Sequence, residues 1–226
     1  MAKIYLSAAA HKYDNPTKCP TKCGENVHCK AYMDIVEKRL KALGFEVKRG
    51  YQDKTGDTAM KNRVAEANKW GADLYYVAHT NAGGGRYSMT MCWDDDASKK
   101  KAAVFTKYRK CVSTHKVKVR TDLYEIRATK MPCLYDELFF HDNAEDCKWF
   151  HSDGMEQLAE ETVRALCELC GVKYVPTTVE KVESKLYRVQ VGAYSKKENA
   201  EAMQNKLKAA GFDAIIKVYS QNESAK

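Results

Sequence analysis

His79 stands where α/β proteins place their chemistry. It follows the apolar, β-prone run 74–78 and comes shortly before the glycine-rich segment 83–85. A buried strand that stops at a glycine-rich loop is typical of an open α/β sheet, which binds ligands at the carboxyl ends of its strands. An imidazole in this place can be a metal ligand, a general base or a core residue. The residues at the ends of the other strands are needed to separate these roles.

Three other residues stand at comparable points. His11 follows the first predicted strand, and Glu25 begins the first predicted helix. With His79 they supply two imidazoles and one carboxylate, the donor set of an open zinc site that keeps one position for water. Glu137, near the end of a later strand, could then take the water proton and pass it to a leaving amine. Two alternatives stay open: Glu25 could be only a first-turn helix acid, and His28, one turn later, is a competing ligand.

The elements that must position these residues alternate along the chain. The apolar and turn patterns predict a strand before Ala10 and further strands at 45–49, 74–79, 87–93 and 132–138. They predict helices at about 25–42, 58–69, 94–110 and 154–170. Strands alternating with helices indicate an α/β fold, with a mixed, mainly parallel sheet and helices on both faces.

The last fifty residues have a different pattern. We predict a first domain at 1–175, a polar linker at 176–184 and a small C-terminal unit at 185–226. Within this unit, 186–194 and 214–218 are predicted strands around a helix at 199–210. One βαβ unit of this size is too small to hold a core of its own.

The composition narrows the class of protein. Of the 226 residues, 44% are hydrophobic and 30% are charged, and no apolar run is long enough for a membrane span, so we predict a soluble globular protein. The formal charge of +8 favours an anionic partner, either nucleic acid, anionic lipid or an anionic cell-envelope polymer. A lysine-rich solvated surface would account for the same charge.

The N-terminus and the cysteines indicate the compartment. Residues 1–10 turn polar too soon for a secretion signal, so we expect synthesis in the cytoplasm without a signal peptide. The nine cysteines, an odd number, are then expected to be reduced thiols. The pairs Cys19/Cys23 and Cys167/Cys170 each supply half of a zinc site, and packing roles are the simpler reading.

Five segments carry a family resemblance when taken in order. They are Ala10-His11, the helix that begins at Glu25, Arg63 to Asn68, Ala78-His79-Thr80-Asn81-Ala82, and Leu134 to Asp146 with its Glu-x-x-Phe-x-x-Asn-x-Glu-Asp pattern. Residues 3 to about 172 resemble the zinc-dependent N-acetylmuramoyl-L-alanine amidases of bacterial autolysins and phage endolysins.

This resemblance implies Zn²⁺ held by His11, Glu25 and His79, with Glu137 as the catalytic carboxylate. The implied reaction is hydrolysis of the amide that joins N-acetylmuramic acid to the L-alanine of the peptidoglycan stem peptide. Asn81 and His141 are expected to contact substrate. The chain departs from the family pattern at Ala10 and Cys29, which stand where glycine and asparagine are usual. The alternative function is therefore a non-catalytic cell-wall-binding protein with a degenerate metal site.

The C-terminal unit has its own resemblance. The segment 187–194, followed by 200–212, is similar to the SPOR domain, a peptidoglycan-binding module with an RNA-recognition-like fold. That module has two βαβ halves, and this chain supplies one. Since a single unit leaves strand edges exposed, we expect two chains to pair as a homodimer.

The expected partner is peptidoglycan, with no nucleic acid and no membrane. Nucleic acid is disfavoured because only Tyr187 and Tyr194 stand ready to stack on bases in the first predicted strand of the tail. The expected place of action is the bacterial cell wall, after release by phage lysis or by lysis of the producing cell. Both an endolysin and an autolysin fit this description.

Overall fold

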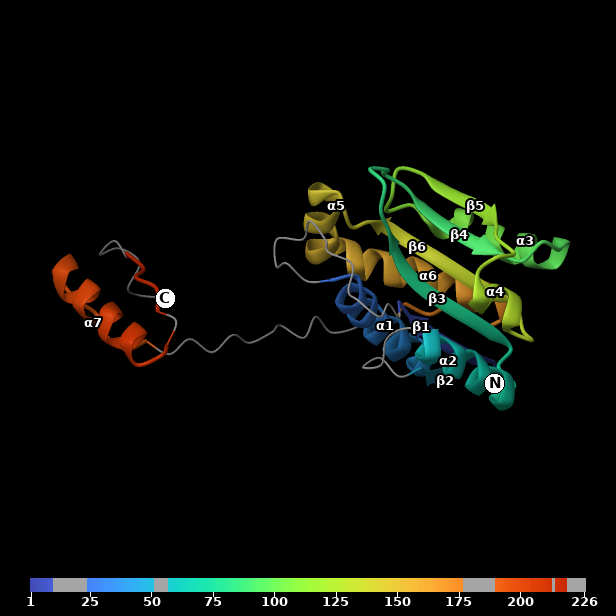
Figure 1. Ribbon diagram of the computed structural model, residues 1–226, viewed down its shortest axis with the longest axis horizontal. Helices are drawn as coiled ribbons and strands as arrows, with labels where there is room; N and C mark the ends of the chain where they lie inside the picture. The colour runs from blue at the N-terminus through green and yellow to red at the C-terminus, as the bar shows by residue number, and fades with distance from the viewer. Residues whose placement is uncertain (10–23, 51–56, 177–189, 213, 219–226) are drawn as a thin grey trace. The chain divides into compact units, whose positions relative to one another are not determined.

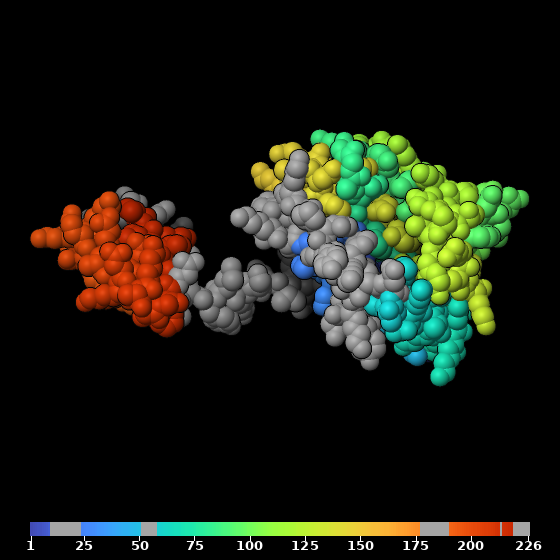
Figure 2. Space-filling model, in the orientation of Figure 1, coloured from blue at the N-terminus to red at the C-terminus, as the bar shows by residue number. Residues whose placement is uncertain are grey.

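The computed structural model describes residues 1–9, 24–50, 57–176, 190–212 and 214–218 (Figure 1). The chain divides into two compact units, Met1–Val179 and Glu180–Lys226. Side chains close the gaps between the strands and helices of the first unit (Figure 2). His11, the linker beyond residue 176, and Cys19 and Cys23 lie outside the described residues.

A six-stranded sheet forms the centre of the first unit. Its strands are β1 (Lys3–Ala8), β2 (Glu46–Arg49), β3 (Leu74–Asn81), β4 (Ser88–Cys92), β5 (His115–Val119) and β6 (Cys133–Phe140). They lie in the order β2-β1-β3-β6-β4-β5. The first four in this order are parallel, β4 runs antiparallel to β6, and β5 is parallel to β4. The predicted mixed, mainly parallel sheet is therefore confirmed.

The strand order places the candidate site. From β1 the chain moves to β2 on one side, and β3 then pairs on the other side of β1. The carboxyl ends of β1 and β3 therefore lie at the point where the strand order reverses, where open α/β sheets bind their ligands. Both strands are almost wholly buried, as expected for strands covered on two faces.

Helices cover both faces of the sheet, as predicted (Figure 1). One face packs against α1 (Glu25–Ala42), α3 (Asp96–Tyr108) and α6 (Met155–Leu169), and the other against α2 (Asp57–Trp70) and α4 (Tyr124–Ala128). In α1 the buried residues Tyr32, Met33, Val36 and Leu40 recur at helical spacing and form the stripe that meets the sheet. Among the helices that the structure describes, none has the length and apolarity needed to cross a bilayer.

Three elements of the first unit were not predicted. The strand β5 has the sequence His-Lys-Val-Lys-Val and lies at the edge of the sheet, where only one side needs a partner and charged side chains are tolerated. The helix α4 has only five residues. The third is a helical segment before α6: α5 (Ala144–Trp149) continues into a π-helical turn, η1 (Phe150–Gly154). A π-helical turn adds a residue to the helix and is often found at functional sites.

The described part of the second unit contains one helix, α7 (Lys197–Ala209), which confirms the predicted helix. The predicted strands are not found where the structure describes them: neither 190–194 nor 214–218 is in a strand. A strand needs a hydrogen-bonded neighbour, and the apolar side chains of Val191, Ile215 and Val218 are exposed instead of packed on one. The helix forms locally, whereas strands depend on a partner.

Candidate active site

The first residue of α1 is tied to the end of β3. The Oε1 atom of Glu25 lies 3.2 Å from Nδ1 of His79 and accepts a hydrogen bond from the backbone nitrogen of Thr80 at 2.9 Å. Glu25 and His79 are both buried. The positive end of the helix dipole favours a carboxylate at this position. Two of the predicted metal ligands are thus in contact.

Glu137 lies directly beside this pair. In the parallel ladder between β3 and β6, Glu137 is the register partner of His79. Side chains at register partners project from the same face of a sheet, so the carboxylate of Glu137 and the imidazole of His79 are neighbours. Tyr135, two residues earlier on the same face, stacks its ring on His79 with a centroid distance of 4.5 Å. A carboxylate from each of two elements therefore flanks one imidazole that rests on an aromatic ring.

The electrostatics of this arrangement favour a cation. Burial by itself lowers the pKa of His79, but its hydrogen bond with Glu25 and the negative charges of Glu25 and Glu137 outweigh burial and raise the pKa above its ordinary value. An arrangement of carboxylates that stabilises positive charge on an imidazole also favours a divalent cation bound between the same groups.

The donor set fits zinc as far as the structure describes it. Within the described ranges, no group of three His, Cys, Asp or Glu side chains converges as a complete metal site. The third predicted ligand, His11, lies outside those ranges. The 3.2 Å between Glu25 and His79 is close to the roughly 3.3 Å that separates two ligands of one tetrahedral zinc ion. An imidazole and a carboxylate are also ordinary zinc ligands.

The two predicted substrate contacts lie beside the end of β3. Asn81 accepts a hydrogen bond from the Ala82 nitrogen through its side-chain oxygen, and its backbone oxygen accepts one from the His141 nitrogen, both at 2.8 Å. His141 is buried, and its Nδ1 atom lies 2.8 Å from Oγ1 of Thr80. Both residues therefore support the loop after β3, and their contact with substrate stays a prediction.

Sequence reasoning missed two residues that shape this edge of the sheet. Arg63, buried on α2, donates hydrogen bonds to the Ala8 oxygen at 2.5 Å and to Ser7 Oγ at 3.2 Å, and so anchors β1 just before His11. Asp142 accepts hydrogen bonds from the Gly83 and Gly84 nitrogens at 2.8 and 2.9 Å, which lower its pKa. Both lie within the segments that carry the resemblance, but their partners are more than fifty residues away.

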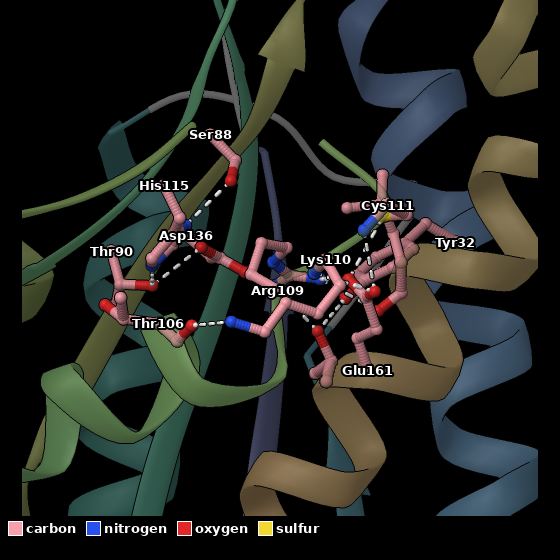
Figure 3. Close-up of polar contacts among 12 residues, drawn as sticks. Tyr32, Ser88, Thr90, Thr106, Arg109, Lys110, Cys111, His115, Asp136 and Glu161 are labelled. Carbon is pink, nitrogen blue, oxygen red and sulfur yellow. Dashed lines mark hydrogen bonds and ion pairs between the residues drawn. The ribbon is translucent and has the colours of Figure 1, made fainter. Parts of the chain in front are cut away.

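Behind the site, the neighbouring residue of β6 belongs to a buried polar network (Figure 3). The carboxylate of Asp136 pairs with Arg109 and accepts hydrogen bonds from Tyr76 at 2.8 Å and Thr90 at 2.9 Å. Arg109 also donates to the Leu158 oxygen at 3.0 Å and to Thr162 at 2.9 Å. This network joins β6 to β3, β4 and α6 beneath the strand that carries Glu137.

Comparisons with known proteins give the same fold and name a family. A family model described as N-acetylmuramoyl-L-alanine amidase matches residues 8–168, and a SPOR domain model matches residues 183–225. The catalytic domain of CwlV, an N-acetylmuramoyl-L-alanine amidase from Bacillus (Paenibacillus) polymyxa var. colistinus, superposes with a TM-score of 0.68 at 24% identity, over 76% of this chain and 100% of that domain.

Two relatives are similar in sequence. The sporulation-specific N-acetylmuramoyl-L-alanine amidase of Bacillus subtilis (strain 168) is 27% identical over 168 residues, and the N-acetylmuramoyl-L-alanine amidase CwlM of Bacillus licheniformis is 28% identical over 168 residues. Each alignment covers 70% of this chain and 62% of the relative, so the chain spans less than two thirds of their length. Since the amidase model covers most of the chain, the chain belongs to the N-acetylmuramoyl-L-alanine amidase family, and a SPOR domain follows its amidase domain.

Proposed function

We propose that this protein is a peptidoglycan hydrolase that cleaves the amide between N-acetylmuramic acid and the L-alanine of the stem peptide. Membership of the amidase family supports the reaction class. The observation that carries the proposal is the register of β3 and β6, which sets Glu137 beside His79 while Glu25 contacts the same imidazole. A hydrolase that uses a metal-activated water needs these groups in one place.

The proposed metal is Zn²⁺, held by Glu25, His79 and, from the sequence, His11. Zinc supplies Lewis acidity that lowers the pKa of a water ligand towards about 7. Glu25 keeps its place because the Thr80 nitrogen donates to its Oε1 atom. The imidazole ring of His79 is held in one orientation because the ring of Tyr135 stacks on it. The protein thus orients both side chains before a metal binds, which favours binding.

Glu137 is the proposed general base and acid. A carboxylate at this position takes a proton from the attacking water and passes it to the nitrogen of the departing L-alanine. The C–N bond then breaks, leaving a carboxylate on the lactyl group and a free amine on the peptide. Glu137 suits the role because it is only half-buried, lies in the carboxyl-terminal half of β6 and is the register partner of His79.

Peptidoglycan is the proposed partner of both units. The SPOR domain match at 183–225 supports a second contact with the wall. The formal charge of +8 suits an envelope that carries anionic polymers. The proposed place of action is the bacterial cell wall, and the two release routes, phage lysis and lysis of the producing cell, stay predictions from the sequence.

Mass spectrometry of wall fragments after digestion tests the reaction. We expect new free L-alanine amino termini without new reducing sugars. New reducing sugars would identify a glycosidase, and new amino termini on other residues a peptidase. Zinc is tested separately: the parent chain should bind one ion that His79→Ala loses. A non-catalytic binding protein, which is not favoured, would bind the wall and release nothing.

We also infer pairing of two C-terminal units, as the sequence predicts. Supporting it, α7 buries no residue within its own unit, and Ile215 and Val218 are 78% and 93% exposed. Sedimentation of the full chain should give a dimer that Ile215→Asp converts to a monomer. Val175→Asp, at an exposed valine of the first unit, is the matched control. If the parent chain sediments as a monomer even at high concentration, the proposed pairing is wrong.

A further inference from the structure

Two histidines outside the site described above point their nitrogens at each other. His28 lies on α1, and His151 lies in η1, 123 residues later. Their Nε2 atoms are 3.1 Å apart. Two nitrogens bound to one metal ion at about 2.0–2.1 Å lie about 3.3 Å apart in a tetrahedron and about 2.9 Å apart as neighbours in an octahedron. The observed separation therefore lies within the range of a shared metal ion.

The inclination of the rings leads to the same interpretation. Each ring nitrogen lies about 1.15 Å from its centroid, so a straight N–H···N bond of this length would put the centroids about 5.4 Å apart. With the nitrogens 3.1 Å apart, rings directed at one shared ion would put the centroids about 4.8–4.9 Å apart. The measured centroid distance is 4.9 Å, with the planes at 67°. Both rings are therefore inclined to the line that joins the two nitrogens, as the rings of two ligands of one ion would be.

The surroundings suit a metal site that fills from solvent. His28 is buried against the rings of Phe139 and Phe150, at centroid distances of 5.7 and 5.4 Å, and these contacts fix its orientation. His151 is exposed, so an ion can reach the pair from water. Burial lowers the pKa of His28 to about 4 and also lowers the pKa of His151. Both imidazoles are therefore neutral at pH 7, as a metal ligand must be.

The π-helical turn explains why His151 faces α1. In η1 the chain makes one wider turn between α5 and α6, and Phe150 at its start is fully buried beside Phe139. With Phe150 held in the core, the next residue is directed towards α1, where His28 lies. An insertion of this kind in a helix is often retained for a functional side chain.

We propose that His28 and His151 form a second metal site, for a divalent transition-metal ion of the kind that imidazole prefers, such as Zn²⁺, Ni²⁺ or Cu²⁺. The ion cross-links α1, whose first residue is Glu25, to the helical segment that leads into α6. Since the folded chain alone holds the two imidazoles together, binding stabilises the fold. The printed contacts of the pair include neither His79 nor Glu137, and the proposal does not depend on the proposed function.

A zinc titration of the chelator-treated full chain, followed by calorimetry, tests this site. The parent should bind one ion more than His151→Ala, and its unfolding temperature should rise further with zinc than that of the variant. Because His151 is exposed, we expect His151→Ala to unfold at the parent temperature in chelator. His115→Ala, which removes an imidazole on the edge strand β5, is the matched control and should bind as many ions as the parent.

A second variant separates this proposal from the proposed function. His79→Ala should lose the catalytic ion and keep the ion that requires His151. Equal binding by the parent and His151→Ala would overturn the second site and leave the proposed function standing. Loss of both ions in His79→Ala would show that the sites are not separate, which also overturns it. If His79→Ala loses no ion, the zinc-dependent function fails while the second site remains.

Discussion

Two neighbouring carboxylates on β6, Asp136 and Glu137, have opposite surroundings. Asp136 has no exposed surface and is held by Arg109, Tyr76 and Thr90 (Figure 3). Glu137 is half-buried and lies beside His79 in the carboxyl-terminal half of β6. Side chains alternate along a strand, so residues next to each other enter different faces. The same functional group is therefore part of the core on one face and available for chemistry on the other.

The comparison shows what decides the role of an acidic residue. A buried carboxylate is tolerated only when its partners replace water, and Asp136 has three of them. Arg109, 1% exposed, keeps its charge because Asp136 offsets the burial that would lower its pKa, and the net shift is upward. A catalytic carboxylate must instead keep room for water and substrate. Four predictions test or sharpen this contrast, beginning with the largest effect.

Glu137→Gln should remove most of the hydrolysis. The amide keeps the shape of the side chain but cannot take a proton, and general acid–base catalysis contributes about 10²–10⁴-fold. Zinc content and unfolding temperature should stay those of the parent. Turbidity loss of purified cell walls measures the rate, and a variant as fast as the parent would exclude Glu137 from the mechanism.

Arg109→Met should act on stability instead. It leaves Asp136 charged and buried without its cation, which costs about 3–5 kcal/mol of unfolding free energy. Arg164→Met is the matched control, since Arg164 is 45% exposed in its ion pair with Glu160 and should contribute about 0–1 kcal/mol. Denaturant unfolding measures both. Equal losses of unfolding free energy in the two variants would show that the buried ion pair stabilises the fold no more than an exposed one.

Stability should fall as the pH drops from about 6.5 to about 4, partly through His115. This imidazole contacts Ser88 and Thr90 at the end of the Asp136 network, and burial lowers its pKa to about 4. In the unfolded chain His115 binds a proton below about pH 6.5, whereas in the folded chain it binds one only below about pH 4. The contribution of neutral His115 to the free energy of unfolding is therefore complete above pH 6.5 and is lost on acidification. We expect this loss to be about 1–3 kcal/mol.

His115→Gln removes this proton while keeping a polar side chain for Ser88. The variant should lose less stability than the parent between pH 6.5 and pH 4, as followed by denaturant unfolding at each pH. A parent and variant with identical pH profiles would show that His115 does not titrate on unfolding.

Asp142→Asn should have the smallest effect. Its carboxylate accepts from the Gly83 and Gly84 nitrogens, and an amide can accept only through its one oxygen. The loop after His79 should then be held less firmly, which we expect to raise KM about two- to fivefold with kcat nearly unchanged. Asp122→Asn is the control, because Asp122 pairs with Arg120 two residues away and contacts neither glycine. A fall in kcat as large as that of Glu137→Gln would assign Asp142 a role in the chemistry.

Local sequence predicted much of this molecule. The apolar runs of β3 and β6 and the stripe of α1 were recognisable because burial requires these patterns. Glu25, His79 and Glu137 were singled out because each stands where a strand ends or a helix begins. The edge strand β5 was not predicted because two lysines break its apolar pattern. The strands of the C-terminal unit were predicted from alternation of apolar and polar residues alone, without an identified partner strand.

By itself, then, the sequence determined the family, the α/β class and three of the residues at the open end of the sheet, since these depend on residue type and local periodicity. Only the tertiary structure decided which side chains meet. The fold brings together residues that are far apart in the sequence. Arg109 and Asp136 are separated by 27 residues, Glu25 and His79 by 54, and His28 and His151 by 123. Such pairs follow from strand order and register, which no local pattern encodes. The physical reason is that burial leaves each polar group only the partners that the fold brings to it.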